Sequence, residues 1–234
     1  MSGGGGGADA AAPGASFVPR VGLDESGKGD YFGPLVAAAC ALVRPEQEQE
    51  LARLGVADSK RLSDGRCRQL AEQLRAMVDW EAVTIFPARY NQLYARLGNV
   101  NRLLAWAHAR ALENLLQRVP VPMVVADQFA VSEQRLREAL MQRGREVVLV
   151  QRHRAEEDLA VAAASVLARD LFLQGLARLS RLAGISLPKG ATHVEQAARQ
   201  VVARGGAELL RQVAKLHFRL TQAVLPGGRG GGDR

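Results

Sequence analysis

Two adjacent acids, Asp24 and Glu25, end a short apolar stretch near the beginning of the chain. A turn containing Gly27, Lys28 and Gly29 follows at once. Carboxylates are hard oxygen ligands that suit Mg²⁺ or Mn²⁺, and glycines let a polar ligand approach the backbone N–H groups. The segment therefore predicts a site for a metal ion and a phosphate. The simpler alternative is a polar turn with solvated acids.

The stretch from Gly22 to Lys28 also fits G-x-x-x-x-G-K, the phosphate-binding loop of nucleotide hydrolases, and Val124–Asp127 resembles the metal-binding strand of those enzymes. However, Gly29 stands where that loop needs a Ser or Thr to hold Mg²⁺. Two carboxylates would also lie inside a loop that has to hold phosphates. These two departures make the nucleotide-hydrolase interpretation the weaker one for this segment.

A further acid, Asp127, follows four mostly apolar residues, so it emerges from a predicted buried strand. Alone it could cap a turn, but Asp24 also lies at the carboxyl end of a predicted strand. Glu156, Glu157 and Asp158 precede an alanine-rich helix. Acids suit a first helical turn without any further role, yet an alanine face packs close to a sheet and would bring one of them near the strand ends. A cluster of four carboxylates would imply bound cations.

A second polar segment, Ala57–Arg61, contains Ser59 and Lys60 between two predicted helices. A hydroxyl and two cations can hold a phosphate. A helix-capping turn with a solvated charge pair explains the same residues.

The elements that position these residues alternate between strand and helix, which predicts an α/β fold with a mixed sheet flanked by helices and a helical C-terminal part. In such sheets, sites collect at strand ends near the middle of the sheet. The predicted strands are Arg20–Asp24, Leu35–Val43, Trp80–Phe86, Pro122–Asp127 and Glu146–Val150. The predicted helices are Pro45–Leu54, Leu62–Met77, Asn101–Val119, Ser132–Met141, Glu157–Leu179, Val194–Arg204 and Ala207–Lys215.

The composition of the 234-residue chain is that of a globular protein, with 47% hydrophobic and 24% charged residues. Glycine-rich ends at residues 1–16 and 226–234 are predicted to be disordered, which leaves 17–225 as one folded domain. No apolar run is long enough to span a bilayer. A net charge of +7 favours a polyanionic partner, and two cysteines are too few for a disulfide framework, so we expect a cytoplasmic protein.

Six motifs make the chain resemble ribonuclease HIII, a bacterial branch of the type 2 ribonuclease H family. They occur in order between Val21 and Phe218: GLDESGKGDYFGP, VADSKRL, VVADQFA, HRAEEDLAVAAASVLARD, LPKGATHVEQAA and KLHF. Lys28 and the following Asp30–Pro34 indicate the HIII branch, because the turn of the HII branch usually carries an arginine.

The resemblance implies a ribonuclease H-like fold and metal-dependent endonucleolytic cleavage of the RNA strand of RNA–DNA hybrids, leaving 5′-phosphate and 3′-hydroxyl ends. It implies a catalytic and metal-binding site of four carboxylates, with two Mg²⁺ or Mn²⁺ ions during catalysis. Asp24, Glu25 and Asp127 match three of them, and Glu156 matches the fourth, with Glu157 or Asp158 as alternatives. The substrate-binding residues that it implies are Gly27, Lys28 and Gly29, which read the ribose, and Ser59 and Lys60, which contact a phosphate.

The chain departs from the resemblance at its beginning, because ribonuclease HIII typically carries an N-terminal substrate-binding domain that resembles a TATA-binding protein. Only about 17 residues precede the predicted core here. We therefore expect weak or salt-sensitive hybrid binding, by a monomer without a membrane or protein partner. The alternative activity is that of the HII branch, cleavage at a single ribonucleotide in a DNA duplex. A non-catalytic nucleic-acid-binding protein ranks lower.

Overall fold

The computed structural model describes residues 17–56, 62–127, 132–152 and 155–225, without the side chains of residues 133, 152 and 156. In this part of the chain the sheet has five strands in the order β3-β2-β1-β4-β5. The strands are β1 (Arg20–Ser26), β2 (Leu35–Leu42), β3 (Asp79–Ile85), β4 (Met123–Asp127) and β5 (Val148–Arg152). β1, β2 and β3 pair antiparallel, whereas β4 runs parallel to β1 and β5 parallel to β4. The predicted mixed sheet is confirmed.

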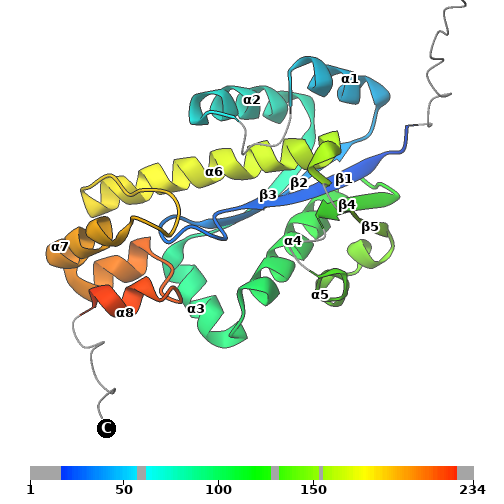
Figure 1. Ribbon diagram of the computed structural model, residues 1–234. Helices are drawn as coiled ribbons and strands as arrows, with labels where there is room; N and C mark the ends of the chain where they lie inside the picture. Colours follow the sequence, from blue (N-terminus) through cyan, green and yellow to red (C-terminus); the bar gives the residue numbers. More distant parts are fainter. Residues whose placement is uncertain (1–16, 57–61, 128–131, 153–154, 226–234) are drawn as a thin grey trace, which may run out of the picture.

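Helices cover both faces of this sheet (Figure 1). They are α1 (Pro45–Arg53), α2 (Asp64–Met77), α3 (Pro87–Leu97), α4 (Val100–Leu116), α5 (Glu133–Ala139), α6 (Leu159–Ala183), α7 (Glu195–Val213) and α8 (Leu220–Val224). α6 lies along one face beneath α1 and α2, and α4 and α5 cover the other face, while α3, α7 and α8 gather at one end. The two large apolar cores of the described residues, one on each face of the sheet, follow from this three-layer arrangement.

The fully buried strand β2 shows how one sequence supplies both cores. Its side chains alternate across the sheet, so Val36 and Cys40 join the core under α6 while Leu35 and Ala39 join the core under α4. Because both faces are covered, apolar residues occupy every position of the strand. Both cysteines of the chain are buried free thiols.

The helix α6 packs against β1 at unusually short range, because Gly22 has no side chain. A Cβ at Gly22 would lie 2.2 Å from the backbone of Ala160 and Val161. Two residues before Ala160, Asp158 caps the helix by accepting a hydrogen bond from the Ala160 N–H, and it forms an ion pair with Arg20 of β1. The predicted close packing of the alanine-rich helix is confirmed. α6 is long and apolar enough to cross a membrane, but 78% of its most apolar 18-residue stretch is buried inside the protein.

Two helices of the structure, α3 and α8, lie outside the predicted elements. α3 was not predicted, although Pro87 suits the first turn of a helix and Gly98 ends it in the left-handed conformation. The break predicted between two C-terminal helices is present, since Gly205 and Gly206 have non-helical backbone angles within α7. The short helix α8 was also not predicted.

Candidate active site

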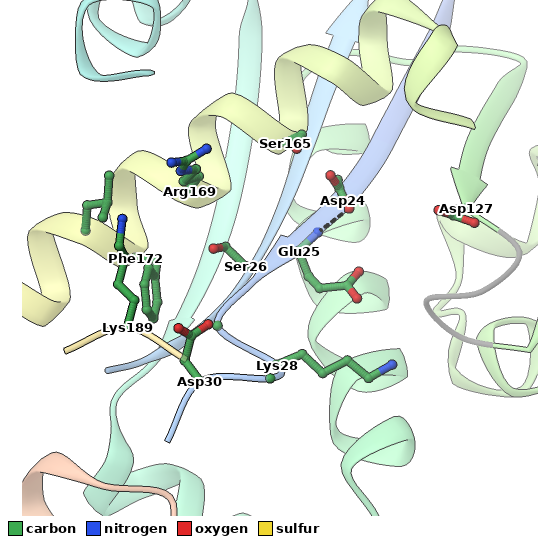
Figure 2. Close-up of a pocket in the computed structure, with 13 residues that line it drawn as sticks. Asp24, Glu25, Ser26, Lys28, Asp30, Asp127, Ser165, Arg169, Phe172 and Lys189 are labelled. Carbon is green, nitrogen blue, oxygen red and sulfur yellow. Dashed lines mark hydrogen bonds between the residues drawn. The ribbon is translucent and has the colours of Figure 1, made fainter. Parts of the chain in front are cut away.

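A cavity of about 520 Å³ opens at the carboxyl ends of β1 and β4 (Figure 2). Residues Asp24–Asp30, from the end of β1 and the turn that follows, form one wall, and Asp127 comes from the end of β4. The remaining side chains come from one face of α6 and from the loop before α7: Ser165, Arg169, Phe172, Leu173 and Lys189.

Asp24 and Asp127 lie on neighbouring parallel strands. The last paired residues of β1 and β4 are Leu23 and Ala126, so each aspartate is the next residue along its strand. Both side chains line the same cavity. The structure thus confirms that these two acids, 103 positions apart in the chain by their numbers, are brought together at the ends of adjacent strands.

Asp24 points toward the α6 face of the sheet. It accepts hydrogen bonds from the hydroxyl of Ser165 on α6 and, at 2.8 Å, from the backbone N–H of Glu25. Burial, and then the negative charge of Glu25, raise the pKa of Asp24 to about 7, although these hydrogen bonds and His108 oppose the shift. The protein therefore holds a carboxylate whose charge is poorly compensated by its own groups, which is the condition that a bound cation relieves.

Glu25 points to the opposite face of the sheet, because successive side chains of a strand alternate. There its Oε2 lies 3.1 Å from Nε2 of His108, a residue of α4 that is buried. Each of the two adjacent acids is thus positioned by a different helix layer: Asp24 by α6 and Glu25 by α4.

The glycine turn after β1 is held rigidly by the protein. Gly27 has a φ of +88°, and a Cβ there would lie 2.1 Å from the carbonyl oxygen of Pro34. The buried ammonium group of Lys215 donates hydrogen bonds to the carbonyls of Asp30 at 2.7 Å and of Gly33 at 2.8 Å. Burial lowers the pKa of Lys215 to about 7, a shift that the charge of Asp30 opposes. By contrast, a Cβ at Gly29 would meet nothing within 4 Å.

The predicted fourth carboxylate, Glu156, has a side chain outside the described part of the structure. Of the two alternatives, Asp158 is buried and occupied by its ion pair with Arg20 and by capping α6, and it does not line the cavity. Glu157 is exposed. The predicted phosphate contacts Ser59 and Lys60 also lie outside the described residues.

A profile of the family described as Ribonuclease HII matches residues 21–221. The chain belongs to the ribonuclease HII family. It is 46% identical to "Ribonuclease HIII" of Protochlamydia amoebophila over 89% of this chain and 69% of the relative, and 41% identical to "Ribonuclease HIII" of Chlamydia pneumoniae over 89% and 71%. The crystal structure of Bst-RNase HIII in complex with Mn²⁺ superposes with a TM-score of 0.80 at 31% identity, covering 88% of this chain and 69% of that one.

This membership makes the chain a ribonuclease H, a hydrolase with endonuclease activity on nucleic acid. The alternative of a nucleotide hydrolase is wrong for a topological reason. The phosphate-binding loop of those enzymes joins a strand to a helix, whereas in this ribonuclease H Gly22 lies within β1 and the turn leads into the antiparallel strand β2.

Four residues at the site were not predicted to act there. Ser165, Arg169 and Lys189 line the cavity, and His108 supports Glu25 from behind. Ser165 and Arg169 are four residues apart and so share one helix face, a spacing that the sequence does contain. In the described part of the chain, no three His, Cys, Asp or Glu side chains converge tightly enough to form a preformed metal cage. The described carboxylates line an open cavity instead.

Proposed function

We propose that this ribonuclease H cleaves the RNA strand of RNA–DNA hybrids and leaves 5′-phosphate and 3′-hydroxyl ends. The observation that carries the proposal is the joint placement of Asp24, Glu25 and Asp127 in one cavity with the glycine turn. The activity on hybrids, rather than on single embedded ribonucleotides, is supported by the name ribonuclease HIII shared by the relatives at 41–46% identity.

The donor set fits divalent cations such as Mg²⁺ or Mn²⁺. Asp24, Glu25 and Asp127 line one cavity with their carboxylates, and the pKa of Asp24 is raised first by burial and then by the negative charge of Glu25. The related structure crystallised with Mn²⁺ supports the same class of ion. We propose that these three residues and Glu156 hold two ions, which when bound stabilise developing negative charge and lower the pKa of water.

The residues of the chain prepare this reaction by fixing the acids before substrate arrives. Ser165 holds Asp24 toward α6, and His108 holds Glu25 toward α4. Both carboxylates therefore offer oxygens in set directions, as partners of ligating groups do in metal sites generally. The scissile phosphodiester would lie between these acids and the turn.

The glycine turn is suited to distinguish RNA from DNA. The 2′-hydroxyl is both a donor and an acceptor that DNA lacks, and Gly27, Lys28 and Gly29 present backbone groups to the cavity. Gly29 is exposed and leaves open space where a side chain would project. We propose that the ribose of the RNA strand occupies that space.

Cleavage of two labelled substrates with Mn²⁺ tests the proposal: a uniform RNA–DNA hybrid, and a DNA duplex with one ribonucleotide. The proposed activity requires cleavage throughout the RNA strand of the hybrid. It also requires that Asp127→Asn abolish cleavage, while Glu195→Gln, which alters an exposed acid on α7, retains it. Preferred cleavage of the second substrate at its single ribonucleotide would favour the HII branch, and an active Asp127→Asn protein would refute the site.

We further propose that the enzyme acts as a cytoplasmic monomer. Both cysteines are buried free thiols, which suits a reducing compartment. Gel filtration at micromolar concentration would test the monomer, because elution as a dimer contradicts it.

A further inference from the structure

A pair of cations lies on the wall of the active-site cavity formed by α6 and the loop before α7. Arg169 comes from α6 and Lys189 from the loop, and both side chains line the cavity together with Asp24. In the view of Figure 2 they lie on the side away from Asp127. Neither residue is needed for the ligation of a metal ion, so their position requires another explanation.

The two cations share one carboxylate. Nη2 of Arg169 lies 2.7 Å from Oδ1 of Asp64, and Nζ of Lys189 lies 2.7 Å from Oδ2 of the same side chain. Asp64 is the first residue of α2, and its side chain is 43% exposed. Two positive charges therefore meet one negative charge at a place that solvent reaches.

The loop that carries Lys189 is fixed to the glycine turn by Gly190, which uses both its N–H and its carbonyl. The N–H of Gly190 donates a hydrogen bond to Oδ1 of Asp30 at 2.6 Å, and the carbonyl of Gly190 accepts one from the N–H of Tyr31 at 2.8 Å. Lys189 thus has a backbone position set by the turn that is proposed to read the ribose. A cation so placed is preorganised to meet the same nucleic acid.

Arg169 is placed relative to the acids by α6. It lies four residues after Ser165, whose hydroxyl binds Asp24, so the two side chains share one helix face about 6 Å apart along the axis. A group held by Arg169 therefore lies beside the site of cleavage and not at it. In a nucleic acid strand, the anionic groups beside a cleaved phosphate are the other backbone phosphates.

We propose that Arg169 and Lys189 form a binding site for a backbone phosphate of the hybrid next to the cleaved one, and that the carboxylate of Asp64 occupies this site when no nucleic acid is bound. Asp64 presents two oxygens to the two cations, as a phosphate would. Substrate entry then exchanges one anion for another. The cations stay in place without the cost of ordering them at the moment of binding.

This inference rests on the proposed function, because it names a subsite for the same substrate. It predicts that substituting a cation and substituting Asp64 change the affinity for the hybrid in opposite directions. Loss of a cation removes a phosphate contact, whereas loss of the Asp64 charge removes a competitor. If Asp64 were only a structural brace for α2 and α6, its loss would loosen both cations and weaken binding.

The test measures the affinity of the purified chain for a fluorescent RNA–DNA hybrid in EDTA, over a series of salt concentrations. Lys189→Ala should weaken binding about tenfold at 0.1 M salt, the loss of one charge-assisted hydrogen bond. It should also reduce the slope of log K against log salt by about one. Asp64→Asn should strengthen binding about two- to fivefold.

Arg118 and Glu81 provide the matched control, because Arg118 is 52% exposed and donates to Glu81 at 2.8 Å outside the cavity. Arg118→Ala and Glu81→Gln should leave the affinity and the salt slope near those of the unaltered chain.

Hybrids with a neutral methylphosphonate backbone in one strand or the other identify the strand that supplies the phosphate. The effect of Lys189→Ala should vanish on one of these two substrates.

An unchanged salt slope in Lys189→Ala, weaker binding by Asp64→Asn, or an effect of Lys189→Ala that persists on both neutral substrates would each overturn the subsite. These outcomes are separable from failure of the proposed function. If the unaltered chain cleaves the hybrid with Mn²⁺ but Lys189→Ala binds the hybrid with normal affinity, only the proposed subsite is refuted. If the unaltered chain does not cleave the hybrid, the proposed function itself is refuted.

Discussion

The substitution Asp24→Asn should stabilise the metal-free protein at neutral and alkaline pH while it removes activity. Asp24 has a pKa raised from the ordinary 3.8 to about 7, first by burial and then by the charge of Glu25. The folded protein therefore binds a proton at Asp24 up to pH 7 that the unfolded chain releases near pH 4. Because the folded state binds more protons in this window, its stability falls as pH rises from 4 to 7.

The magnitude follows from the size of this pKa change, which corresponds to ~4 kcal/mol in full. Asp24 is partly exposed to the cavity, so solvent screening reduces the effect, and we expect a gain of ~2 kcal/mol for Asp24→Asn at pH 8. For a chain of this length such a gain raises Tm by about 4–8 °C. At pH 4 the gain should vanish, because Asp24 is then neutral in the folded protein.

Thermal unfolding in EDTA at pH 4 and pH 8 measures this difference, with Glu195→Gln as the control for deleting an exposed carboxylate. Addition of Mn²⁺ at pH 8 should stabilise the unaltered chain, by ~3 kcal/mol at a hundredfold excess over Kd, and should stabilise Asp24→Asn less. A variant that is less stable than the unaltered chain at pH 8 in EDTA, or equally stabilised at both pH values, would refute the reasoning about the charge of Asp24.

Three further substitutions test the supports of the site. Gly29→Ala should keep Tm within about 2 °C, since its Cβ meets nothing in the protein, and should lower kcat/KM on hybrids; an unimpaired enzyme would show that nothing occupies that space. His108→Ala, which removes the partner of Glu25, should raise the Mn²⁺ concentration for half-maximal activity about tenfold, and His108→Asn should restore part of it; an unchanged metal titration would contradict this role. Gly22→Val should lower Tm by at least about 8 °C, because its side chain would meet the backbone of α6 at 2.2 Å, and an unchanged Tm measured by circular dichroism would contradict the packing.

Local sequence signals predicted the parts of the fold that depend on apolar periodicity. The fully apolar stretch that became β2 and the acid at the end of β4 were both assigned correctly, and parallel pairing then placed Asp127 beside Asp24. α3 was missed because its start depends on Pro87 and its end on Gly98, rather than on a long apolar stripe.

The supports of the site could not be predicted in the same way, because they depend on contacts between distant elements. His108 lies on α4 and meets Glu25 only after α4 packs against β1. Lys189 reaches the cavity through the hydrogen bonds of Gly190 to the glycine turn. Asp158 was a candidate ligand by its place in the chain, and only its ion pair with Arg20 shows that it stabilises α6 instead.

The two adjacent acids of β1 face opposite sides of the sheet, and this has a consequence for how the enzyme is made. Asp24 lacks its hydrogen bond from Ser165 until α6 docks, and Glu25 lacks its contact with His108 until α4 docks. A newly synthesised chain with only one helical layer in place would lack one of the two braces. Nuclease activity should therefore emerge together with complete assembly of the domain.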